Sequence, residues 1–398
     1  MPMQAKPEIP TGLPIPDPAG AAHSNAVAGY IRMKIAESGG SIGFAEFMQF
    51  ALYAPGLGYY NAGSTKFGPG GDFVTAPELS PLFGRVLAVQ CAELLPGLSA
   101  HHLLEVGAGS GALAIQVLGK LAALNALPEK YFILEPSAEL QARQRHRIAR
   151  ELPTVLPRVE WIHGWPRTFA GVVIANEVAD ALPVTRFVIR AGKVLELRVS
   201  AGAAGFEWLE QDATASLRAA VSRIETELST TLLDGYVSEV CLPMPAWIGD
   251  LAACLSEGFV FLFDYGMSRR EYYSAEHRGG CLRCHFRHRV HNDPLILPGI
   301  QDLSAWVDFS LVAEAAVNGG MEVAGFVTQA HFLLDGGLQR ELEQLSTLPV
   351  REQFELSRQV KLLTLPGEMG EHFKCLGLSK GSDAVPSALR QSDRAHTL

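Results

Sequence analysis

The central part of the chain carries short apolar runs that alternate with segments of helical periodicity. Runs without regular polar alternation are typical of parallel strands that are buried on both faces of a sheet. The predicted strands are Leu103–Val106, Tyr131–Glu135, Val159–His163, Val172–Ala175 and Phe259–Phe263. Because helix-like segments join these runs, the pattern predicts an α/β fold with a doubly wound, mostly parallel sheet.

The elements around this sheet divide the chain into segments. We expect a Pro-rich tail over 1–22 that is extended or disordered, and an N-terminal helical segment over 23–100 that packs on the core. The sheet domain then covers 101–398, with insertions at about 183–258 and 267–300.

Elements outside the central strands are predicted from shorter patterns. The second insertion is basic, rich in histidine and without clear periodicity. The other predicted elements are a helix capped by Ser24, a helix over Phe44–Leu52, a hairpin of Thr185–Ile189 and Val194–Val199, a helix from Leu217 to Leu228, a helix over Leu303–Leu311, and two closing strands within Met321–Leu334.

Composition and charge narrow the class of protein. Hydrophobic residues make up 48% of the chain and charged residues 19%, which is enough apolar material for a large core. The formal net charge of −9 disfavours sequence-independent binding of nucleic acid. The six cysteines do not form the framework of a disulfide-rich protein.

The tail gives no sign of targeting to a membrane or an organelle. It lacks the apolar core of a signal peptide and the Arg-rich amphipathic pattern of a transit peptide. No apolar run approaches the ~18 residues that a membrane-spanning helix needs. We therefore expect a cytoplasmic protein without a membrane span.

The segment Leu104–Gly111 lies where a predicted strand passes into a predicted helix. Its glycines allow a tight turn and expose backbone N–H groups beside the helix N-terminus, which favours a polar or anionic ligand group. With Ala112 the segment fits the dinucleotide fingerprint G-x-G-x-x-G/A. With Glu105 it fits an acid followed by G-x-G-x-G, the loop of Rossmann-like methyltransferases. A purely structural glycine turn is the third interpretation.

The acid before the glycines favours the methyltransferase interpretation. S-adenosylmethionine (SAM) carries a sulfonium and an ammonium group, to which the Glu105 carboxylate is useful. The same carboxylate would repel the pyrophosphate of a dinucleotide. Glu135, at the end of the next strand, suits the two ribose hydroxyls of either cofactor.

Beyond this loop, the sequence resembles the MidA-like class I SAM-dependent methyltransferases over nearly the whole chain after the tail. Mitochondrial members of that family assist complex I assembly by methylating an arginine of a complex I subunit. One departure is Val178-Ala179, where many relatives have two aromatic residues. The resemblance rests on the segments Ala51–Tyr60, Gly71–Ser80, Leu104–Gly111, Ala175–Pro183, Phe263–Gly266, Asp302–Phe309 and Gly370–Lys374.

The resemblance implies a Rossmann-like core and a set of site residues. The segment from Thr75 through Pro77 to Glu78 is expected to close over the cofactor, and Asn176 and Glu177 to face the methyl-transfer site. Independently, ligands in open α/β sheets bind outside the carboxyl ends of the strands. The predicted cofactor-binding residues are Glu105, Gly107, Gly109, Gly111, Glu135, Asn176, Thr75, Pro77 and Glu78.

The predicted catalytic residues are Glu177 first and Asp180 second. An arginine nucleophile keeps its proton in free solution, so a carboxylate must hold the guanidinium and draw positive charge from the attacking nitrogen. The alternative for both residues, and for Asn176, is helix capping. Asp264 also falls at a predicted strand end.

A cluster formed by Cys281, Cys284, His285 and His288 allows three interpretations. The spacing C-x-x-C-H matches c-type haem attachment, which requires export. Two cysteines and nearby histidines could bind zinc, although the usual second ligand pair is missing. We favour a basic loop, residues 278–289, on the substrate side, and expect no metal.

Three functions remain open from the sequence. The first is a protein-arginine methyltransferase acting on a partner subunit, and the second is a methyltransferase for a small molecule or another residue. The third is a SAM-binding assembly factor with little catalysis. A homodimer is compatible with the sequence, which carries no signal that decides the oligomeric state.

Overall fold

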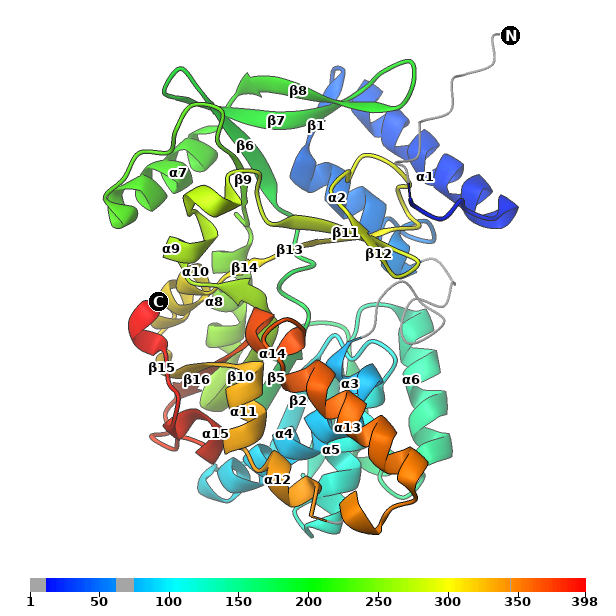
Figure 1. The fold of residues 1–398 in the computed structure, drawn as a ribbon, viewed down its shortest axis with the longest axis vertical. Helices are drawn as coiled ribbons and strands as arrows, with labels where there is room; N and C mark the ends of the chain where they lie inside the picture. Colours follow the sequence, from blue (N-terminus) through cyan, green and yellow to red (C-terminus); the bar gives the residue numbers. More distant parts are fainter. Residues whose placement is uncertain (1–11, 62–74, 344) are drawn as a thin grey trace. The chain divides into compact units, whose positions relative to one another are not determined.

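The structure, a computed structural model, describes residues 12–61, 75–343 and 345–398. In this part of the chain the residues form two compact units (Figure 1). Unit 1 combines residues up to 61 with 181–243 and 269–306, and unit 2 combines 75–180, 244–268 and 307–398. The predicted boundary near residue 100 therefore differs from the structure, because 75–100 belongs to the unit that holds the large sheet.

Unit 2 is built on a mixed sheet. Its described strands are, in chain order, β2 (His102–Val106), β3 (Lys130–Leu134), β4 (Val159–Ile162), β5 (Phe169–Asn176), β10 (Leu255–Met267), β14 (Val307–Asp308), β15 (Glu322–Thr328) and β16 (Phe373–Lys380). All five strands predicted from the central apolar runs are present at or near their predicted bounds.

The order of these strands positions the site. Across the sheet it is β15-β16-β10-β5-β2-β3-β4, and β14 pairs with β10. Strands β10, β5, β2, β3 and β4 run parallel, whereas β16 is antiparallel to both of its neighbours. From β2 the chain moves outward to β3 and β4, and then returns to β5 and β10 on the other side. Ligands of open α/β sheets bind at such a reversal of strand order.

Both faces of this sheet are buried at its central strands, β5 and β10. Phe259, Phe261 and Phe263 of β10 pack in one core cluster with residues of α4 and α5. The alternating residues Val260 and Leu262 are buried on the opposite face. This explains why the parallel strands have continuous apolar runs and not an alternating pattern.

The helices of unit 2 connect and cover these strands. The described helices are α3 (Ala76–Leu79), α4 (Pro81–Leu94), α5 (Ala112–Ala123), α6 (Ala138–Glu151), α8 (Met244–Cys254), α10 (Phe309–Asn318), α11 (Gln329–Asp335), α12 (Leu338–Glu341), α13 (Val350–Thr364), α14 (Met369–His372) and α15 (Ser387–Arg390).

Two predictions near the C-terminus are wrong. The helix expected over Leu303–Leu311 begins only at Phe309, where the Asp308 carboxylate accepts the N–H of Leu311 at 3.1 Å. The second closing strand expected within Met321–Leu334 is helix α11, because the Thr328 hydroxyl caps a new helix at that point. The second closing strand is β16. In each case the apolar run was too short to separate helix from strand.

Unit 1 contains the first helices, the first insertion up to residue 243 and most of the second insertion. Residues 244–258 of the first insertion belong to unit 2. The described strands of unit 1 are β1 (Ser41–Gly43), β6 (Thr185–Arg190), β7 (Lys193–Ala201), β8 (Phe206–Asp212), β9 (Val237–Val240), β11 (Leu282–Phe286), β12 (Arg289–His291) and β13 (Asp302–Ala305). The hairpin β6–β7 and helix α7 (Ala215–Leu228) confirm the prediction for the first insertion. The second insertion has more order than expected, since β12, β11 and β13 form an antiparallel sheet.

The N-terminal helices differ in how well the sequence predicted them. Helix α2 (Phe44–Tyr53) agrees with the prediction. Helix α1 begins at Pro18 and not after Ser24, because the Asp17 carboxylate accepts the N–H of Gly20 at 2.8 Å. A proline in the first helical turn is a start signal, so the expectation of an extended tail is wrong for residues 18–22. Residues 1–11 lie outside the described part.

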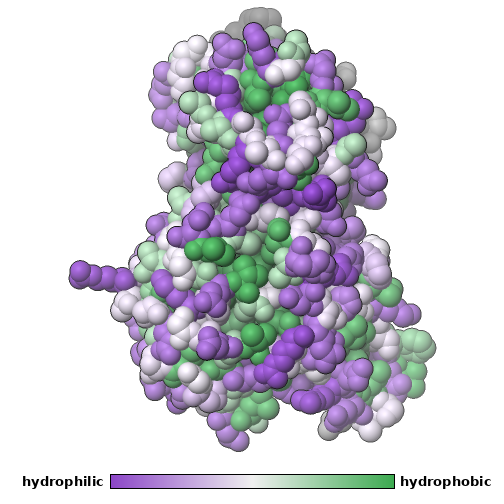
Figure 2. Space-filling view, turned by 90° about the vertical axis from the view of Figure 1, so that its left-hand side faces the viewer, coloured by the Kyte–Doolittle hydropathy of each residue, from purple (hydrophilic) through white to green (hydrophobic). Residues whose placement is uncertain are grey.

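The surface in Figure 2 shows hydrophobic residues in patches that hydrophilic residues separate. Within the described residues, each helix is too short or too polar to cross a lipid bilayer.

Candidate functional site

The glycine loop follows β2 at the centre of the parallel strands. The N–H of Gly107 donates to the carbonyl of Leu134 in the neighbouring strand at 3.0 Å, which continues the pairing of β2 with β3 to the first residue of the loop. Gly107, Gly109 and Gly111 have φ values of 68°, 51° and 81°, in the left-handed region that favours glycine. Gly111 caps the N-terminus of α5. The N–H of Gly111 donates within the loop, to the Ala108 carbonyl at 2.7 Å. That the loop presents backbone N–H groups to a polar ligand group stays a prediction.

Glu105, the acid before the loop, lies in the core. Glu105 is only 2% exposed, and its Oε2 accepts a hydrogen bond from the hydroxyl of Tyr131 at 2.6 Å. Burial raises the pKa of Glu105 to about 7, although the hydrogen bond from Tyr131 opposes the shift. A direct contact between this carboxylate and a cationic ligand stays a prediction.

Glu135 lies directly after β3, and a buried glutamine joins it to the loop. Gln144 of α6 donates from Nε2 to the Gly109 carbonyl at 2.9 Å and to Oε2 of Glu135 at 3.2 Å. The other oxygen of Glu135 accepts the N–H of Ser137 at 3.0 Å. The indole of Trp161 donates to Oε1 of Gln144 at 2.8 Å. The structure thus brings together the predicted loop and the predicted ribose-binding acid.

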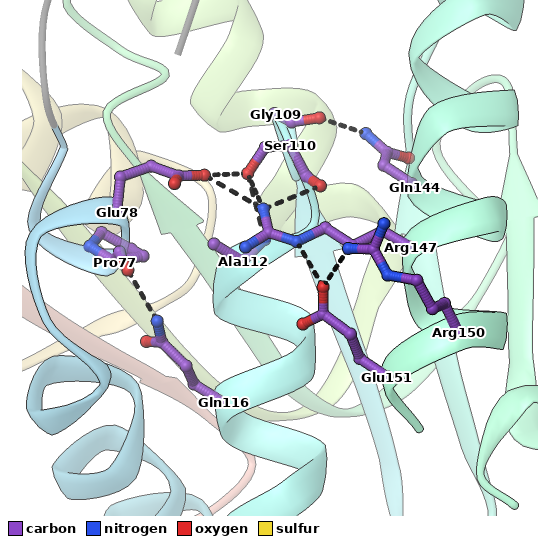
Figure 3. Close-up of polar contacts among 10 residues, drawn as sticks. All are labelled: Pro77, Glu78, Gly109, Ser110, Ala112, Gln116, Gln144, Arg147, Arg150 and Glu151. Carbon is purple, nitrogen blue, oxygen red and sulfur yellow. Dashed lines mark hydrogen bonds and ion pairs between the residues drawn. The ribbon is translucent and has the colours of Figure 1, made fainter. Parts of the chain in front are cut away.

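The segment before α4 is tied to the same loop (Figure 3). Glu78 accepts the hydroxyl of Ser110, and Arg147 of α6 lies 3.2 Å from the Glu78 carboxylate and 2.7 Å from the Ser110 hydroxyl. Pro77 accepts the amide of Gln116 through its carbonyl at 2.6 Å. The Glu78 carboxylate is therefore held against the glycine loop.

Thr75 is the N-cap residue of α3, and its side chain forms no capping hydrogen bond with this helix. Residues 71–74 of the same motif, and most of the glycine-rich stretch Gly56–Gly71, lie outside the described part of the chain. That Thr75, Pro77 and Glu78 contact the cofactor stays a prediction.

The turn after β5 holds the two predicted catalytic residues. Glu177 has a φ of 54°, a left-handed conformation that is uncommon for a residue with a side chain. Its N–H donates to the carbonyl of Phe263 at 2.9 Å, and Asn176 donates through its amide to the Glu177 carboxylate at 3.2 Å. No helix begins here, since the chain turns through 177–183 into β6. The helix-capping alternative for Asn176, Glu177 and Asp180 is therefore wrong.

Asp264, at the end of β10, fixes the backbone of this turn. Its fully buried carboxylate accepts the N–H groups of Val178, Ala179 and Asp180 at 3.2, 2.9 and 3.2 Å through one oxygen. Its other oxygen accepts the N–H of Tyr265 at 2.9 Å. Burial and the nearby Glu177 carboxylate raise the pKa of Asp264, and the backbone donors oppose this shift.

The turn and the glycine loop lie side by side. A side-chain carbon added at Gly107 would be 3.1 Å from Cγ2 of Val178, so only glycine fits there without moving Val178.

Burial raises the pKa of Tyr265, and the carboxylates of Glu177, Asp180 and Glu368 add to the shift. Negative charge is therefore concentrated beside the phenol of Tyr265.

The cysteine cluster of unit 1 has a structural setting. Cys281 and Cys284 are both fully buried, and burial raises the pKa of each thiol, to about 12 for Cys281. Cys284 lies in β11, and Cys281 directly precedes this strand. Among residues 12–61, 75–343 and 345–398, no three His, Cys, Asp or Glu side chains gather as a metal site. The absence of zinc and haem stays a prediction.

Three residues of the site were missed by sequence reasoning: Gln144, Arg147 and Asp264 in its role of holding the turn. Gln144 had a usable signal, because it lies four residues after Leu140 and four before Ile148, in the middle of the buried stripe of α6. A polar residue at such a position requires partners inside the protein. Arg147 gave no comparable signal.

The residues present fit SAM by their chemistry. Three left-handed glycines allow a ligand to approach the loop backbone, and Glu135 has a carboxylate of the kind that accepts vicinal hydroxyls. The fold and site together define an α/β protein that binds a nucleoside-containing cofactor at the carboxyl ends of its parallel strands.

Comparison with known families shows which family this chain belongs to and which cofactor it uses. Residues 86–327 match a family model described as "Putative S-adenosyl-L-methionine-dependent methyltransferase". The chain belongs to this family of SAM-dependent methyltransferases. SAM as the cofactor, predicted from the glycine loop and its acid, is confirmed.

Relatives match along most of the chain. A crystal structure of a protein from Burkholderia thailandensis bound to S-adenosyl-homocysteine is 39% identical, with a TM-score of 0.91, over 97% of this chain and 100% of that one. The Drosophila melanogaster protein named "Protein arginine methyltransferase NDUFAF7 homolog, mitochondrial" is 30% identical over 89% of this chain and 85% of the relative. The Homo sapiens protein arginine methyltransferase NDUFAF7, also named mitochondrial, is 28% identical over 86% of this chain and 81% of the relative.

Proposed function

We propose that this SAM-dependent methyltransferase transfers methyl groups to an arginine side chain of a protein partner. The observation that carries the proposal is the turn after β5, where Glu177 keeps its carboxylate in a left-handed backbone conformation beside the glycine loop. Strained non-glycine residues cluster at functional sites. The names of the relatives, which are protein arginine methyltransferases, support the same acceptor.

The cofactor-binding side of the mechanism uses the ends of β2 and β3. In our proposal, the backbone of Gly107, Gly109 and Gly111 approaches the cofactor, and Glu135 accepts its ribose hydroxyls. When bound, SAM supplies an electrophilic methyl group. Glu105 adds negative charge behind the loop, and Glu78 with its neighbours Thr75 and Pro77 covers the opposite side.

The acceptor side uses the turn after β5. The carboxylate of Glu177 binds the guanidinium through charge-assisted hydrogen bonds and keeps the attacking nitrogen in line with the methyl group. The new carbon–nitrogen bond would form as the methyl–sulfur bond breaks and S-adenosyl-homocysteine leaves, and the carboxylate takes up the proton that leaves the nitrogen. Asp180 is the second candidate for this role, and Asn176 orients Glu177 through the 3.2 Å contact.

We also infer that the sheet of unit 2 is a doubly wound, Rossmann-like core. The support is the strand order, which runs outward from β2 to β4 and then from β5 to β10, with all five strands parallel. The polar ends of β2, β3, β5 and β10 then face one crevice, as strand ends do at a switch point.

The partner and the location belong to the same proposal. The resemblance to MidA-like proteins favours a subunit of a complex I-type assembly as the methyl acceptor. A cytoplasmic location stays a prediction from the sequence, while the curated relatives carry the word mitochondrial in their names. Homodimerisation is a further open property.

The test is identification of the methyl acceptor by mass spectrometry. Lysate is incubated with purified protein and methyl-labelled SAM, with the Gly109→Val variant as the control. We expect the label on arginine in one or a few proteins, and only with the unmodified enzyme. Label on a small molecule or on another residue type would replace the arginine proposal, and no label in any fraction would favour the assembly-factor alternative.

A further inference from the structure

Gln144 occupies a position that neither the family motifs nor the proposed reaction uses. It lies on the buried stripe of α6 and its side chain is fully buried. A buried side-chain amide costs free energy unless it forms hydrogen bonds. Its polar atoms face three groups, two of which belong to the cofactor site: the Gly109 carbonyl and the Glu135 carboxylate.

The chemistry of these neighbours fixes the orientation of the amide. The indole N–H of Trp161 can only donate, so the atom that faces it at 2.8 Å must be the amide oxygen. The amide nitrogen then points to the Gly109 carbonyl and the Glu135 carboxylate, which can only accept. Its two hydrogens match these two acceptors, so a flipped amide would lose all three bonds.

We propose that Gln144 is a positioning residue that sets the register between the glycine loop and Glu135. One amide nitrogen holds both, so the loop backbone and the carboxylate cannot shift independently. The loop and Glu135 would bind two parts of one ligand, and Gln144 keeps these two binding groups at a constant distance from each other. The inference rests on the proposed contact between Glu135 and the cofactor ribose.

A second observation supports close packing at this point. A side-chain carbon added at Gly111 would be 3.5 Å from Cγ of Gln144, an ordinary van der Waals distance, so the glutamine stem lies beside the end of the loop. The amide of Gln144 holds Gly109, and Arg147 of the same helix donates to the Ser110 hydroxyl at 2.7 Å. The loop is thus held from α6 at two positions.

The test measures discrimination between two ligands. S-adenosyl-homocysteine and its 2′-deoxy analogue are titrated calorimetrically into the full chain and its variants. A site that hydrogen-bonds a ligand hydroxyl binds the analogue without it less tightly. For Gln144→Met we expect about 10-fold weaker binding of S-adenosyl-homocysteine and a loss of most of the discrimination between the two ligands, because Glu135 is no longer oriented.

A matched control lies one turn earlier on the same helix. Gln141 donates to the backbone carbonyl of Glu135 at 2.6 Å and not to its carboxylate. Gln141→Met should therefore leave the discrimination unchanged. If Gln144→Met does not fold, as judged by its melting temperature, Trp161→Phe serves instead: it keeps an aromatic ring and removes the indole N–H that holds the Gln144 amide, and we expect a smaller loss of discrimination in the same direction.

The outcomes separate this inference from the proposed function. Glu135→Gln should lose the same discrimination, and the double variant with Gln144→Met should lose no more than either single variant. If Glu135→Gln loses discrimination and the Gln144 and Trp161 variants keep it, Gln144 is not a positioning residue. If Glu135→Gln itself binds both ligands as the unmodified protein does, the ribose contact proposed for Glu135 is wrong, and the inference fails with it.

Discussion

The glycine loop and the turn after β5 solve the same backbone problem with different residues. Both follow buried parallel strands that are neighbours in the sheet, and both turn through left-handed conformations. In the loop, the left-handed positions Gly107, Gly109 and Gly111 carry no side chain. In the turn, the left-handed position is Glu177, with φ 54°.

The difference indicates which part of each residue acts. In our proposal the backbone of the loop is the binding group, so a side chain there would only occupy ligand space. In the turn a side chain is kept although glycine would remove strain of roughly 1 kcal/mol. Asp264 holds the following three residues and so stabilises the strained conformation. We infer that the carboxylate of Glu177 is the functional group of the turn.

The largest expected effect comes from breaking the loop. Gly109→Val places a β-branched side chain at φ 51°, which that side chain cannot adopt without strain, and fills space given to the cofactor. We expect no detectable SAM binding by calorimetry. Gly192→Val is the matched control: Gly192 also has a left-handed φ, 72°, but nothing lies within 4 Å of its added carbon. Normal SAM binding by Gly109→Val would refute the assignment of the loop.

Glu105, the acid before the loop, should change how the free energy of unfolding depends on pH. The pKa of Glu105 is about 7 in the folded protein, against 4.5 ordinarily, so between these values the folded state binds more protons than the unfolded state. The free energy of unfolding should therefore be highest at the acid end and fall as pH rises from about 4.5 to 7, by about 3 kcal/mol from this group. Glu105→Gln should remove that slope in urea titrations. Parallel curves for both proteins would show that Glu105 is not buried as described.

A smaller effect tests the strain in the turn. Glu177→Gly relieves the left-handed backbone, and we expect the free energy of unfolding to rise by up to about 1 kcal/mol while methyl transfer is lost. Ser229, a left-handed residue that ends α7, provides the comparison. Ser229→Gly should stabilise by a similar amount and leave transfer unchanged. A marked loss of stability for Glu177→Gly alone would make Glu177 a structural residue.

The sequence predicted the parts of the fold that long patterns encode. Strands β2, β5 and β10 have the continuous apolar runs of parallel strands that are buried on both faces, and all three are present. The predicted strands β3 and β4 are present too, although they are only partly buried. The errors lie where a capping residue overrides a short pattern: Asp17 starts α1 early, Asp308 delays α10, and Thr328 converts a predicted strand into α11. These caps act through single hydrogen bonds that periodicity does not record.

The candidate site was predictable to the level of strand ends. The rule that ligands bind at the carboxyl ends of parallel strands placed Glu135, Asn176 and Glu177 together. It could not show that Asp264 binds the backbone of the turn, because that contact joins residues more than eighty positions apart. The bridge from Gln144 to Glu135 likewise depends on the packing of α6 and not on a motif.

Single-turnover transfer by Glu177→Gln tests the central claim most directly. Glutamine keeps the size of the side chain and loses the charge that binds a guanidinium. The acceptor is the protein that the mass-spectrometric experiment identifies. We expect methyl transfer to this acceptor to fall about 100-fold, the scale of a lost acid–base group. SAM affinity and melting temperature, measured on the same samples, should stay nearly unchanged. Transfer at the unmodified rate, with or without a lower melting temperature, would contradict the account and leave Asp180 as the candidate.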